Sequence, residues 1–348
     1  MNTKMNERRL PSEWEPQQAV LMAWPHAQTD WEPILPDVLE CYGRIVKAIS
    51  EVTPVIVVGP ERLCNPSFTQ AGFNPARVTF IDIPTNDTWT RDYGPITIAD
   101  GSGLTAIDFK FNGWGLKFAA DRDNLVNLHL YSLGLLPGTR ENRLGFVLEG
   151  GSIESDGRGT ILTTSECLLS PNRNGDLDRQ QIEERLHRYL GASHVLWLDH
   201  GALAGDDTDS HIDTLARLAP DDTIIYCGPG EEGDPNNPGL EAMKEQLKTL
   251  LTPAGQPYHL VELPLPAPIY DSDGMQLPAT YANYLVSNGT VFVPTYGQLR
   301  KDTLAAMMIQ SVYHTYRIVP LDCRALIQQH GSLHCASMQF PTLHHILK

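Results

Sequence analysis

Short apolar runs alternate with segments of helical periodicity along most of this chain. Strands are predicted at residues 20–24 and 54–58, where apolar and β-branched residues follow one another. Between them, apolar residues recur at helical spacing: Ile34, Leu35, Val38, Leu39, Tyr42, Ile45, Val46 and Ile49. The pattern predicts a β-α-β unit at the start of the chain.

The same alternation continues toward the C-terminus. Further strands are predicted at residues 78–83, 96–99, 105–109, 160–164, 195–198, 223–227, 259–263 and 290–294. Helices are predicted at residues 176–190, 240–251, 303–313 and 323–329. The fold class is therefore α/β, and the Gly-, Pro- and Asn-rich residues 228–239 are interpreted as one long loop. We detect no strong internal repeat.

Length and charge narrow the classes of protein. A chain of 348 residues that is 41% apolar can bury a large core, as one big domain or two ordinary ones. It has 26 Lys and Arg against 42 Asp and Glu, a formal net charge of −16, which repels phosphate backbones and anionic lipids. We therefore expect no nucleic-acid partner, whereas a small cationic ligand would be attracted.

Neither a membrane span nor a disulfide framework is expected. No apolar run approaches the roughly 20 residues of a membrane span, and residues 1–10 lack the apolar core of a secretory signal. The six cysteines are scattered, with no CxxC pair: Cys41, Cys64, Cys167, Cys227, Cys323 and Cys335. This distribution argues against structural zinc and suits a reducing compartment, so we expect a soluble, cytoplasmic protein.

Four polar segments interrupt the apolar rhythm, and each follows or begins a predicted strand. They are residues 86–95, 149–152, 205–213 and 334–335. Taken singly, Asp92 beside Arg91 is explained by a local ion pair, and Glu149 by a turn carboxylate. Residues 206–213 are explained by a solvated acidic loop, and Cys335 by a small buried side chain. Taken together, they place a thiol, a histidine and several carboxylates on loops that a rigid scaffold can present to one site.

That combination predicts a cationic substrate. Nearby carboxylates raise the pKa of a thiol and leave little thiolate at neutral pH, so Cys335 would be a poor nucleophile on its own. A cation held by the carboxylates would lower the thiol pKa at the moment of binding. Guanidinium is the natural candidate, because it is planar, permanently charged and offers paired N–H donors to carboxylates.

These segments carry a resemblance to a known family. The parts that carry it are residues 89–95, 149–152, 156–157 with 159–160, 166–169 with 172–174, 205–213 and 334–335. In this order, between Leu10 and Pro341, the chain resembles the agmatine deiminase family, whose members are also known as bacterial peptidylarginine-deiminase-like proteins. The resemblance implies a pentein fold, with five ββαβ-type units around a pseudo-fivefold axis. It further implies a single domain over residues 1–348, and we expect residues 1–9 to form a poorly ordered N-terminal extension.

The resemblance also implies a role for each site residue. Cys335 matches the nucleophile that attacks the guanidinium carbon, and His211 matches the general acid/base. Asp92 and Asp213 match the carboxylates that hold the guanidinium nitrogens, and Glu149 matches the acidic residue that supports the histidine. The implied reaction hydrolyses agmatine to N-carbamoylputrescine and ammonia through a covalent amidino-cysteine intermediate, without a metal or organic cofactor. Members of the family commonly form homo-oligomers.

Two segments depart from the family pattern. A run of glycines commonly precedes the His-Cys pair, whereas this chain has His330-Gly331-Ser332-Leu333. A common Trp-Gly-Gly is replaced by Trp114-Gly115-Leu116. These changes leave the proposed catalytic side chains in place, so they bear on the substrate more than on the reaction. His334 does not match the acid/base of the family.

The residues that would bind the rest of the substrate are less defined. Trp89 and Trp114 are candidates to pack on the methylene chain or the guanidinium, although core packing is the commoner role of tryptophan. The distal amine of agmatine would suit a further carboxylate, and Asp207 and Asp87 are the candidates. The sequence does not decide between them.

Other hypotheses remain open. A deiminase of another guanidine, such as arginine or peptidyl-arginine, would use the same residues. A metal-dependent hydrolase would leave Cys335 without a role. It could use four residues as metal ligands: Asp207, Asp209, His211 and Asp213. An amidinotransferase would pass the same intermediate to an amine. A non-catalytic polyamine-binding protein would need the carboxylates without the thiol.

Overall fold

The computed structural model describes residues 8–101 and 103–342, and the predicted β-α-β unit lies within them. β1 (Gln17–Ala23) and β2 (Val55–Gly59) pair in parallel, and α1 (Leu35–Ser50) connects them. The helix buries residues from its predicted apolar face: Val38, Tyr42, Ile45, Val46 and Ile49. The prediction for this unit is therefore confirmed.

The strands of the described residues form five sheets that share one wiring. In each sheet a short first strand runs antiparallel to the second, and a helical connection leads to a third strand parallel to the second. The orders are β16-β1-β2-β3, β4-β5-β6, β7-β8-β9, β10-β11-β12 and β13-β14-β15. Parallel neighbours need such a crossover, whereas an antiparallel pair needs only a hairpin.

The remaining helices and strands are assigned to the five units in chain order. The first unit also contains α2 (Glu61–Ala71) and β3 (Val78–Asp82), and the second contains β4 (Ile96–Asp100), β5 (Gly103–Lys110), α5 (Asp123–Ser132) and β6 (Thr139–Val147). The third has β7 (Ile153–Ser155), β8 (Thr160–Thr164), α8 (Arg179–Leu190) and β9 (His194–Leu198). The fourth has β10 (Ala216–Ala219), β11 (Thr223–Cys227), α9 (Asn237–Leu247) and β12 (His259–Leu263). The fifth has β13 (Leu285–Ser287), β14 (Thr290–Thr295), α10 (Leu299–Val312) and β15 (Arg317–Asp322).

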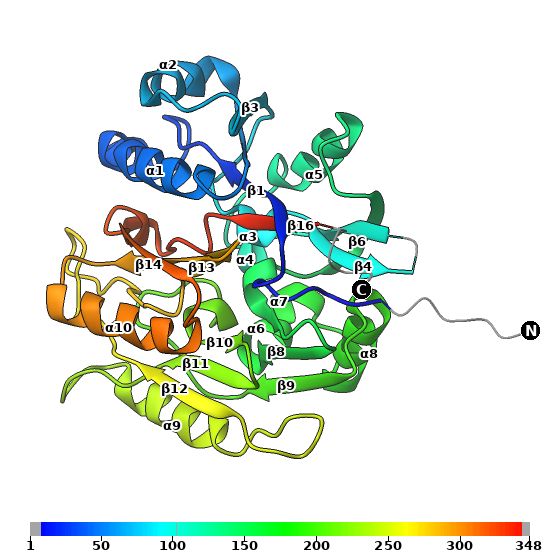
Figure 1. The fold of residues 1–348 in the computed structure, drawn as a ribbon, viewed down its shortest axis with the longest axis vertical. Helices are drawn as coiled ribbons and strands as arrows, with labels where there is room; N and C mark the ends of the chain where they lie inside the picture. Colours follow the sequence, from blue (N-terminus) through cyan, green and yellow to red (C-terminus); the bar gives the residue numbers. More distant parts are fainter. Residues whose placement is uncertain (1–7, 102, 343–348) are drawn as a thin grey trace, which may run out of the picture.

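The last strand closes the arrangement. β16 (Met338–Pro341) returns to the first sheet and pairs antiparallel with β1. Figure 1 shows the five units in chain order around a common centre, with α1, α8, α9 and α10 toward the outside. The five units that the resemblance implied are therefore present, although no repeat could be detected in the sequence.

The segment that precedes the first strand of each unit lies near the centre of the ring. Three of these segments form single helical turns: α3 (Thr90–Tyr93) before β4, η2 (Gly150–Ser152) before β7 and η3 (Ile212–Thr214) before β10. The turns α3 and η2 contact each other, and so do η2 and η3. Loops far apart in the chain therefore meet at one place.

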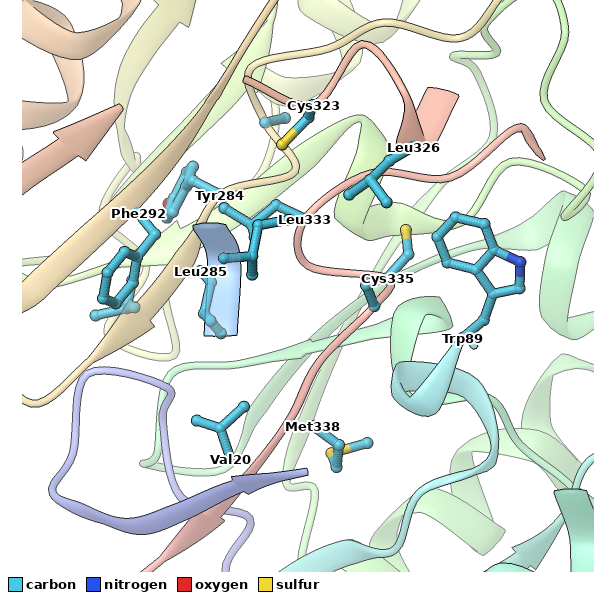
Figure 2. Close-up of a cluster of buried hydrophobic side chains, with 14 of the residues drawn as sticks. Val20, Trp89, Tyr284, Leu285, Phe292, Cys323, Leu326, Leu333, Cys335 and Met338 are labelled. Carbon is cyan, nitrogen blue, oxygen red and sulfur yellow. The ribbon is translucent and has the colours of Figure 1, made fainter. Parts of the chain in front are cut away.

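The segment before β16 is anchored by apolar packing on both sides of Cys335. Leu333 and Met338 are buried in one cluster with Val20 of β1 and Phe292 of β14. Figure 2 shows these side chains around the loop that carries the thiol. Burying such side chains contributes about 1.5–3 kcal/mol each. Cys335 is thereby held on a rigid part of the core.

Some predicted elements need correction. The predicted helix 323–329 is wrong, because only the single 3-10 turn η4 (Leu326–Gln329) forms there, directly after β15. Of the expected N-terminal extension, residues 1–7 lie outside the described residues, whereas Arg9 pairs with Ala99 through two backbone hydrogen bonds of 2.8 Å. Within the described residues, every helix is too short or too polar to cross a membrane.

Candidate active site

Five of the predicted site residues converge at the centre of the ring. Asp92 comes from α3, Glu149 from the residue before η2, His211 and Asp213 from the start of η3, and Cys335 from the loop before β16. All five are buried, and Cys335 is the most exposed of them at 5%. Each of them precedes the first strand of its own unit, so the repeated wiring brings them together.

Gly151 lies where three of these side chains meet. A Cβ atom on Gly151 would lie 2.6 Å from His211 Nδ1, 2.8 Å from Asp92 Oδ1 and 3.2 Å from Asp213 Oδ2. Its backbone is not in the left-handed region, so the need for glycine comes from space and not from conformation. The backbone N–H of Gly151 also donates a 3.1 Å hydrogen bond to Asp92 Oδ1.

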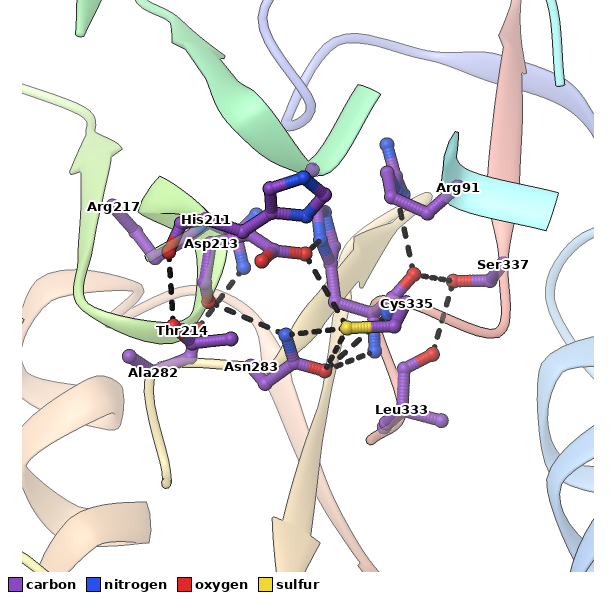
Figure 3. Close-up of polar contacts among 12 residues, drawn as sticks. Arg91, His211, Asp213, Thr214, Arg217, Ala282, Asn283, Leu333, Cys335 and Ser337 are labelled. Atoms are coloured by element: carbon purple, nitrogen blue, oxygen red, sulfur yellow. Dashed lines mark hydrogen bonds and ion pairs between the residues drawn. The ribbon is translucent and has the colours of Figure 1, made fainter. Parts of the chain in front are cut away.

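The Cys335 thiol faces acidic neighbours. Its Sγ lies 3.6 Å from Asp213 Oδ2 and 3.2 Å from Asn283 Nδ2, as Figure 3 shows. Burial, followed by the negative charges of Asp213 and Asp92, raises the pKa of the Cys335 thiol well above its ordinary value. The thiol is therefore protonated at neutral pH until a positive charge arrives.

Asn283 is a site residue that the sequence reasoning missed. Its Oδ1 accepts hydrogen bonds from the backbone N–H groups of His334, at 2.9 Å, and Cys335, at 3.3 Å. Its Nδ2 lies within reach of both the thiol and the Asp213 carbonyl, at 3.2 and 3.3 Å. Asn283 precedes β13, which is the equivalent position in the fifth unit, and recognising the repeat would have pointed to it.

His211 lies between two carboxylates. Its Nε2 is 3.2 Å from Glu149 Oε2, and its Nδ1 is 3.6 Å from Asp92 Oδ1. Burial alone would lower the pKa of His211, but the charges of Asp92 and Cys167 and the hydrogen bond with Glu149 raise it well above its ordinary value. The imidazole therefore carries a proton at neutral pH, as a general acid must.

Glu149 is fixed from behind by two further residues. Arg173 donates a 2.7 Å hydrogen bond from Nε to Glu149 Oε2, and the Cys167 thiol lies 3.7 Å from the same oxygen. Burial would raise the pKa of Glu149, but His211 and Arg173 together lower it, so the carboxylate stays ionised. Arg173 and Cys167 belong to the segments that carried the family resemblance, but no role was predicted for either.

Trp114 joins the site through its indole nitrogen. Its Nε1 donates a 2.9 Å hydrogen bond to Asp92 Oδ2, and the ring packs edge-on against Phe111 with centroids 5.0 Å apart.

The two segments that depart from the family pattern each contain a residue with a left-handed backbone. The φ angle is 71° at Leu116 and 65° at His330. A left-handed backbone at a residue other than glycine costs about 1–3 kcal/mol and is typical of functional loops.

The remaining predicted residues are Trp89, Asp207 and Asp87. Trp89 is 4% exposed and packs on Trp31 with ring centroids 5.6 Å apart, and Figure 2 shows it beside Cys335. Asp207 is exposed, and its backbone carbonyl accepts a 2.6 Å hydrogen bond from Lys117. Asp87 is buried and accepts a 2.7 Å hydrogen bond from the Thr88 backbone; its burial raises the carboxyl pKa to about 7.

The ligand set of the metal-hydrolase hypothesis is not assembled. Asp209 is paired with Arg173 and Lys117, and Asp213 with His334, while Asp207 is exposed. Among the described residues, two groups have donor atoms close enough to share a metal ion, and neither is the predicted set: Glu149, Cys167, His211 and Glu13, Glu154, His334. Arg173 already pairs with Glu149 in the first group, and Arg217 bridges Glu13 and Glu154 in the second, which disfavours a second cation in either.

Solved structures with the same architecture define the class of this protein. A C. jejuni agmatine deiminase in which serine replaces a cysteine, solved with substrate bound, superposes with a TM-score of 0.90 over 98% of both chains at 36% identity. A Porphyromonas gingivalis protein provisionally named an arginine deiminase superposes with a TM-score of 0.90 at 47% identity, covering 96% of this chain and 98% of the other. The protein is therefore a pentein-fold hydrolase that acts on C–N bonds of amidines.

The family follows from the sequence over almost its whole length. The model of the Porphyromonas-type peptidyl-arginine deiminases matches residues 9–341. A Vibrio parahaemolyticus protein provisionally named an agmatine deiminase is 33% identical over 352 residues, which covers 95% of this chain and 96% of the relative. The chain belongs to the Porphyromonas-type peptidyl-arginine deiminase family, and the predicted resemblance is confirmed.

Proposed function

We propose that this protein hydrolyses agmatine to N-carbamoylputrescine and ammonia, with Cys335 as the nucleophile. The observation that carries the proposal is the arrangement of buried acceptors at the centre of the ring. Asp213 Oδ1 and Glu149 Oε1 are buried and have no hydrogen-bond partner among the described residues, and the pKa of Asp92 is raised to about 6, first by burial. Such a group of carboxylates accepts a planar cation with several N–H donors.

Asp92 and Asp213 would hold the guanidinium. Both carboxylates lie within 3.2 Å of the position of a Cβ on Gly151, so they border the same space. Trp114 and the Gly151 N–H fix the orientation of Asp92, which leaves its remaining lone pairs for substrate. Orienting the cation with its carbon toward Sγ can contribute about 7–11 kcal/mol to the barrier reduction.

The reaction then proceeds in two covalent steps. The bound cation lowers the thiol pKa, the Cys335 thiol loses its proton to solvent, and the thiolate adds to the guanidinium carbon. The tetrahedral adduct loses one nitrogen as ammonia, after His211 gives that nitrogen a proton, and an S-alkylthiouronium remains. His211, now neutral, takes a proton from water as the water oxygen attacks the same carbon. Breaking the C–S bond returns the thiolate, and the hydroxyl proton of the adduct is lost to solvent as the neutral ureido product leaves.

Agmatine is favoured over free arginine by the charges beside His211. Arginine carries an α-carboxylate that would need a cationic partner. Lys117 and Arg173 reach the loop that precedes His211, and both are paired with Asp209 at 2.6 and 2.5 Å. The same loop carries the exposed Asp207, which suits an amine. A second candidate, an arginine or peptidyl-arginine deiminase, is supported by the name of the family and of the P. gingivalis relative.

The test is ammonia release from agmatine, free arginine, a blocked arginyl peptide and simple alkylguanidines. We expect turnover of agmatine, lost in Cys335→Ala and retained in Cys227→Ala, which removes another buried thiol. Turnover of arginine or the peptide, but not of agmatine, would change the proposed substrate and leave the proposed reaction in place. Silence with every guanidine by a folded protein would overturn the proposal. Product diverted by an added amine would indicate amidino transfer.

The residue that binds the distal amine can be assigned with the same assay. Asp207→Asn and Asp87→Asn would be compared on agmatine and on butylguanidine, which lacks the amine. The variant that removes the amine partner should raise KM for agmatine and leave KM for butylguanidine unchanged. An equal change for both substrates would exclude that aspartate as the amine partner.

A further inference from the structure

His334, the neighbour of the nucleophile, is buried between two carboxylates. Its Nδ1 lies 2.8 Å from Asp213 Oδ2, and its Nε2 lies 2.7 Å from Glu13 Oε2. The side chain is 1% exposed. Nε2 also lies 3.0 Å from Arg217 Nη2, which can only donate. The hydrogen bond to the acceptor Asp213 Oδ2 therefore requires a hydrogen on Nδ1 of the ring.

A compensated charge cluster holds Glu13 and His334 in place. Arg217 donates to Glu13 Oε2 at 2.6 Å and to Glu154 Oε1 at 2.5 Å. Its Nη1 also donates to the carbonyls of Ala282 and Tyr284, and its guanidinium lies 4.6 Å from the centre of the Tyr284 ring. Glu13 Oε1 accepts a 2.6 Å hydrogen bond from the Val286 N–H. A segment that is remote in sequence therefore supports the residue next to Cys335.

Asp213 connects this cluster with the nucleophile. Its Oδ2 accepts from His334 and lies 3.6 Å from Cys335 Sγ, whereas its Oδ1 is buried without a hydrogen-bond partner among the described residues. Burial would raise the pKa of Asp213, but the hydrogen bond and the charge of His334 lower it. The charged or titratable groups around Asp213 are His334, His211, Arg217, Cys335, Asp92 and Arg91.

We propose that His334 is a positioning residue for capture of the guanidinium. By binding Oδ2, it keeps Asp213 ionised and leaves Oδ1 to accept from the substrate. Glu13 and Arg217 contact Nε2 and maintain the orientation of His334, so they act through it. This inference rests on the role of Asp213 that is proposed above. His334 does not exchange protons with the substrate; that role stays with His211.

Two isosteric variants separate the hydrogen bonds of His334. The amide nitrogen of asparagine can occupy about the place of Nδ1, so His334→Asn keeps the donor to Asp213. The amide nitrogen of glutamine reaches about the place of Nε2, so His334→Gln keeps only the donor to Glu13. We expect kcat/KM to fall about 10- to 100-fold in His334→Gln, mainly through KM, and less in His334→Asn.

The pH profile distinguishes positioning from mere structural support. Without the donor to Oδ2, burial is left to raise the pKa of Asp213, so the acid limb of kcat/KM should move to higher pH in His334→Gln. Glu13→Gln should move it in the same direction by less, because His334 then keeps its donor to Asp213 but is held less firmly at Nε2. Glu15→Gln is the matched control, since Glu15 lies in the same segment and binds Arg9 and Ser12.

Several outcomes would overturn this inference. Equal losses in His334→Asn and His334→Gln, or losses confined to kcat with an unmoved acid limb, would show that the side chain only supports the fold. If neither His334 variant folds by circular dichroism, an unmoved limb in Glu13→Gln would have the same meaning.

Failure of the proposed function is distinguishable from failure of this inference. If the proposed function is wrong, the parent protein turns over no guanidine. The pH dependence of Cys335 alkylation by 2-chloroacetamidine, which carries a cationic amidinium, then replaces kcat/KM as the readout. We expect the acid limb of that alkylation to move to higher pH in His334→Gln, and an unmoved limb would reject the role of His334.

Discussion

Two groups of buried ionisable residues meet at the centre of this molecule, and they differ in how well they are satisfied. In the catalytic group, His211 Nδ1, Glu149 Oε1 and Asp213 Oδ1 have no hydrogen-bond partner among the described residues. In the axial group, made of Glu13, Glu154, Arg217 and His334, none of the described polar atoms is buried without a partner. The two groups are joined by the contact between His334 and Asp213.

The difference shows what each group does. A buried polar atom without a partner costs about 1–3 kcal/mol, and three such atoms gathered at one place are explained by a ligand that supplies their partners. Burial, together with the excess of carboxylates in the catalytic group, raises the pKa of the Cys335 thiol. The axial group alternates charges and lies beside a cavity of about 60 Å³ lined by Glu13, Glu154, Arg91 and His334. The catalytic group therefore offers acceptors to an added cation, whereas the axial group already contains Arg217 as its cation.

The largest expected effect is loss of turnover without loss of stability in the catalytic group. Cys335→Ser should lower kcat by about 10⁴-fold or more, because the nucleophile is removed, while agmatine binding and the melting temperature stay near those of the parent. Steady-state ammonia assays, calorimetric titration and thermal unfolding measure the three quantities. A variant that binds no agmatine would contradict the separation of binding from chemistry.

A labelling experiment sharpens this prediction. All six cysteines are buried, so exposure alone does not favour one of them. A cationic haloacetamidine should nevertheless alkylate Cys335 first, because Asp92 and Asp213 bind its amidinium. Peptide mapping after partial labelling identifies the site, and uncharged iodoacetamide is the control reagent. Similar labelling of all six thiols by the cationic reagent would contradict the carboxylate clamp.

The next effect is loss of stability in the axial group. Arg217→Met leaves Glu13 and Glu154 buried without their cation, which should lower the free energy of unfolding by about 3–5 kcal/mol. The matched control is Arg317→Met, which breaks an exposed ion pair with Glu51 and should cost no more than about 1 kcal/mol. Denaturant unfolding compares the three proteins. Equal stability of both variants would mean that the axial group does not stabilise the fold.

A single methyl group can test the shape of the catalytic group. Gly151→Ala would place a Cβ within 3.2 Å of His211, Asp92 and Asp213, so the affinity for agmatine should fall about 100-fold, a loss of about 2.7 kcal/mol. Gly43→Ala, in α1, has no atom within 4 Å of the added Cβ and is the control. Calorimetric titration should give an unchanged dissociation constant for the control. Unchanged affinity in Gly151→Ala would place the guanidinium elsewhere.

Much of the fold was predictable, and the missed elements have physical causes. The second strands β8, β11 and β14 are buried along nearly their whole length, so they consist mainly of apolar and β-branched residues. The first strands β7, β10, β13 and β16 have three or four residues, too few for a period to be visible. Helix α5 was missed because both of its faces are mixed: Leu125, Leu128 and Tyr131 are exposed, whereas Asp123 and Asn127 are buried beside Val126 and Leu130. Helix α2 contains Pro66 and buries only Cys64.

Site residues were predictable where the residue type by itself indicates a chemical role. Cys335, His211 and the three carboxylates could be proposed from resemblance and from the need of a thiol for a cation. Asn283 and Glu13 could not, because a lone amide and a carboxylate near the start of the chain have many ordinary roles. Their importance comes from the ring closure that brings residue 13, the start of β13 and the loop before β16 together. Contacts of that range are set by the fold and not by local spacing.

The smallest effect that we predict is a gain of stability that accompanies loss of function in Asp92→Asn. The pKa of Asp92 is raised from 3.8 to about 6, first by burial and then by its carboxylate neighbours, so the ionised form destabilises the fold by about 3 kcal/mol. Asparagine removes this charge but loses one hydrogen bond to a charged acceptor, which offsets about 1.5–3 kcal/mol. The net gain should be about 1 kcal/mol at pH 8.

The sign of this effect can be checked by its pH dependence. Below pH 3.8 the carboxyl is protonated in both the folded and the unfolded protein, so its charge makes no difference to stability. Between pH 3.8 and about 6 the folded protein keeps a proton that the unfolded protein has lost, so the parent loses stability relative to Asp92→Asn as the pH rises. Above about pH 6 the difference stays constant. Denaturant unfolding at several pH values measures it, with the exposed Asp37→Asn as the control. A parent that gains stability over Asp92→Asn through this range would mean that Asp92 is stabilised as an anion, and the contrast between the two buried groups would fail.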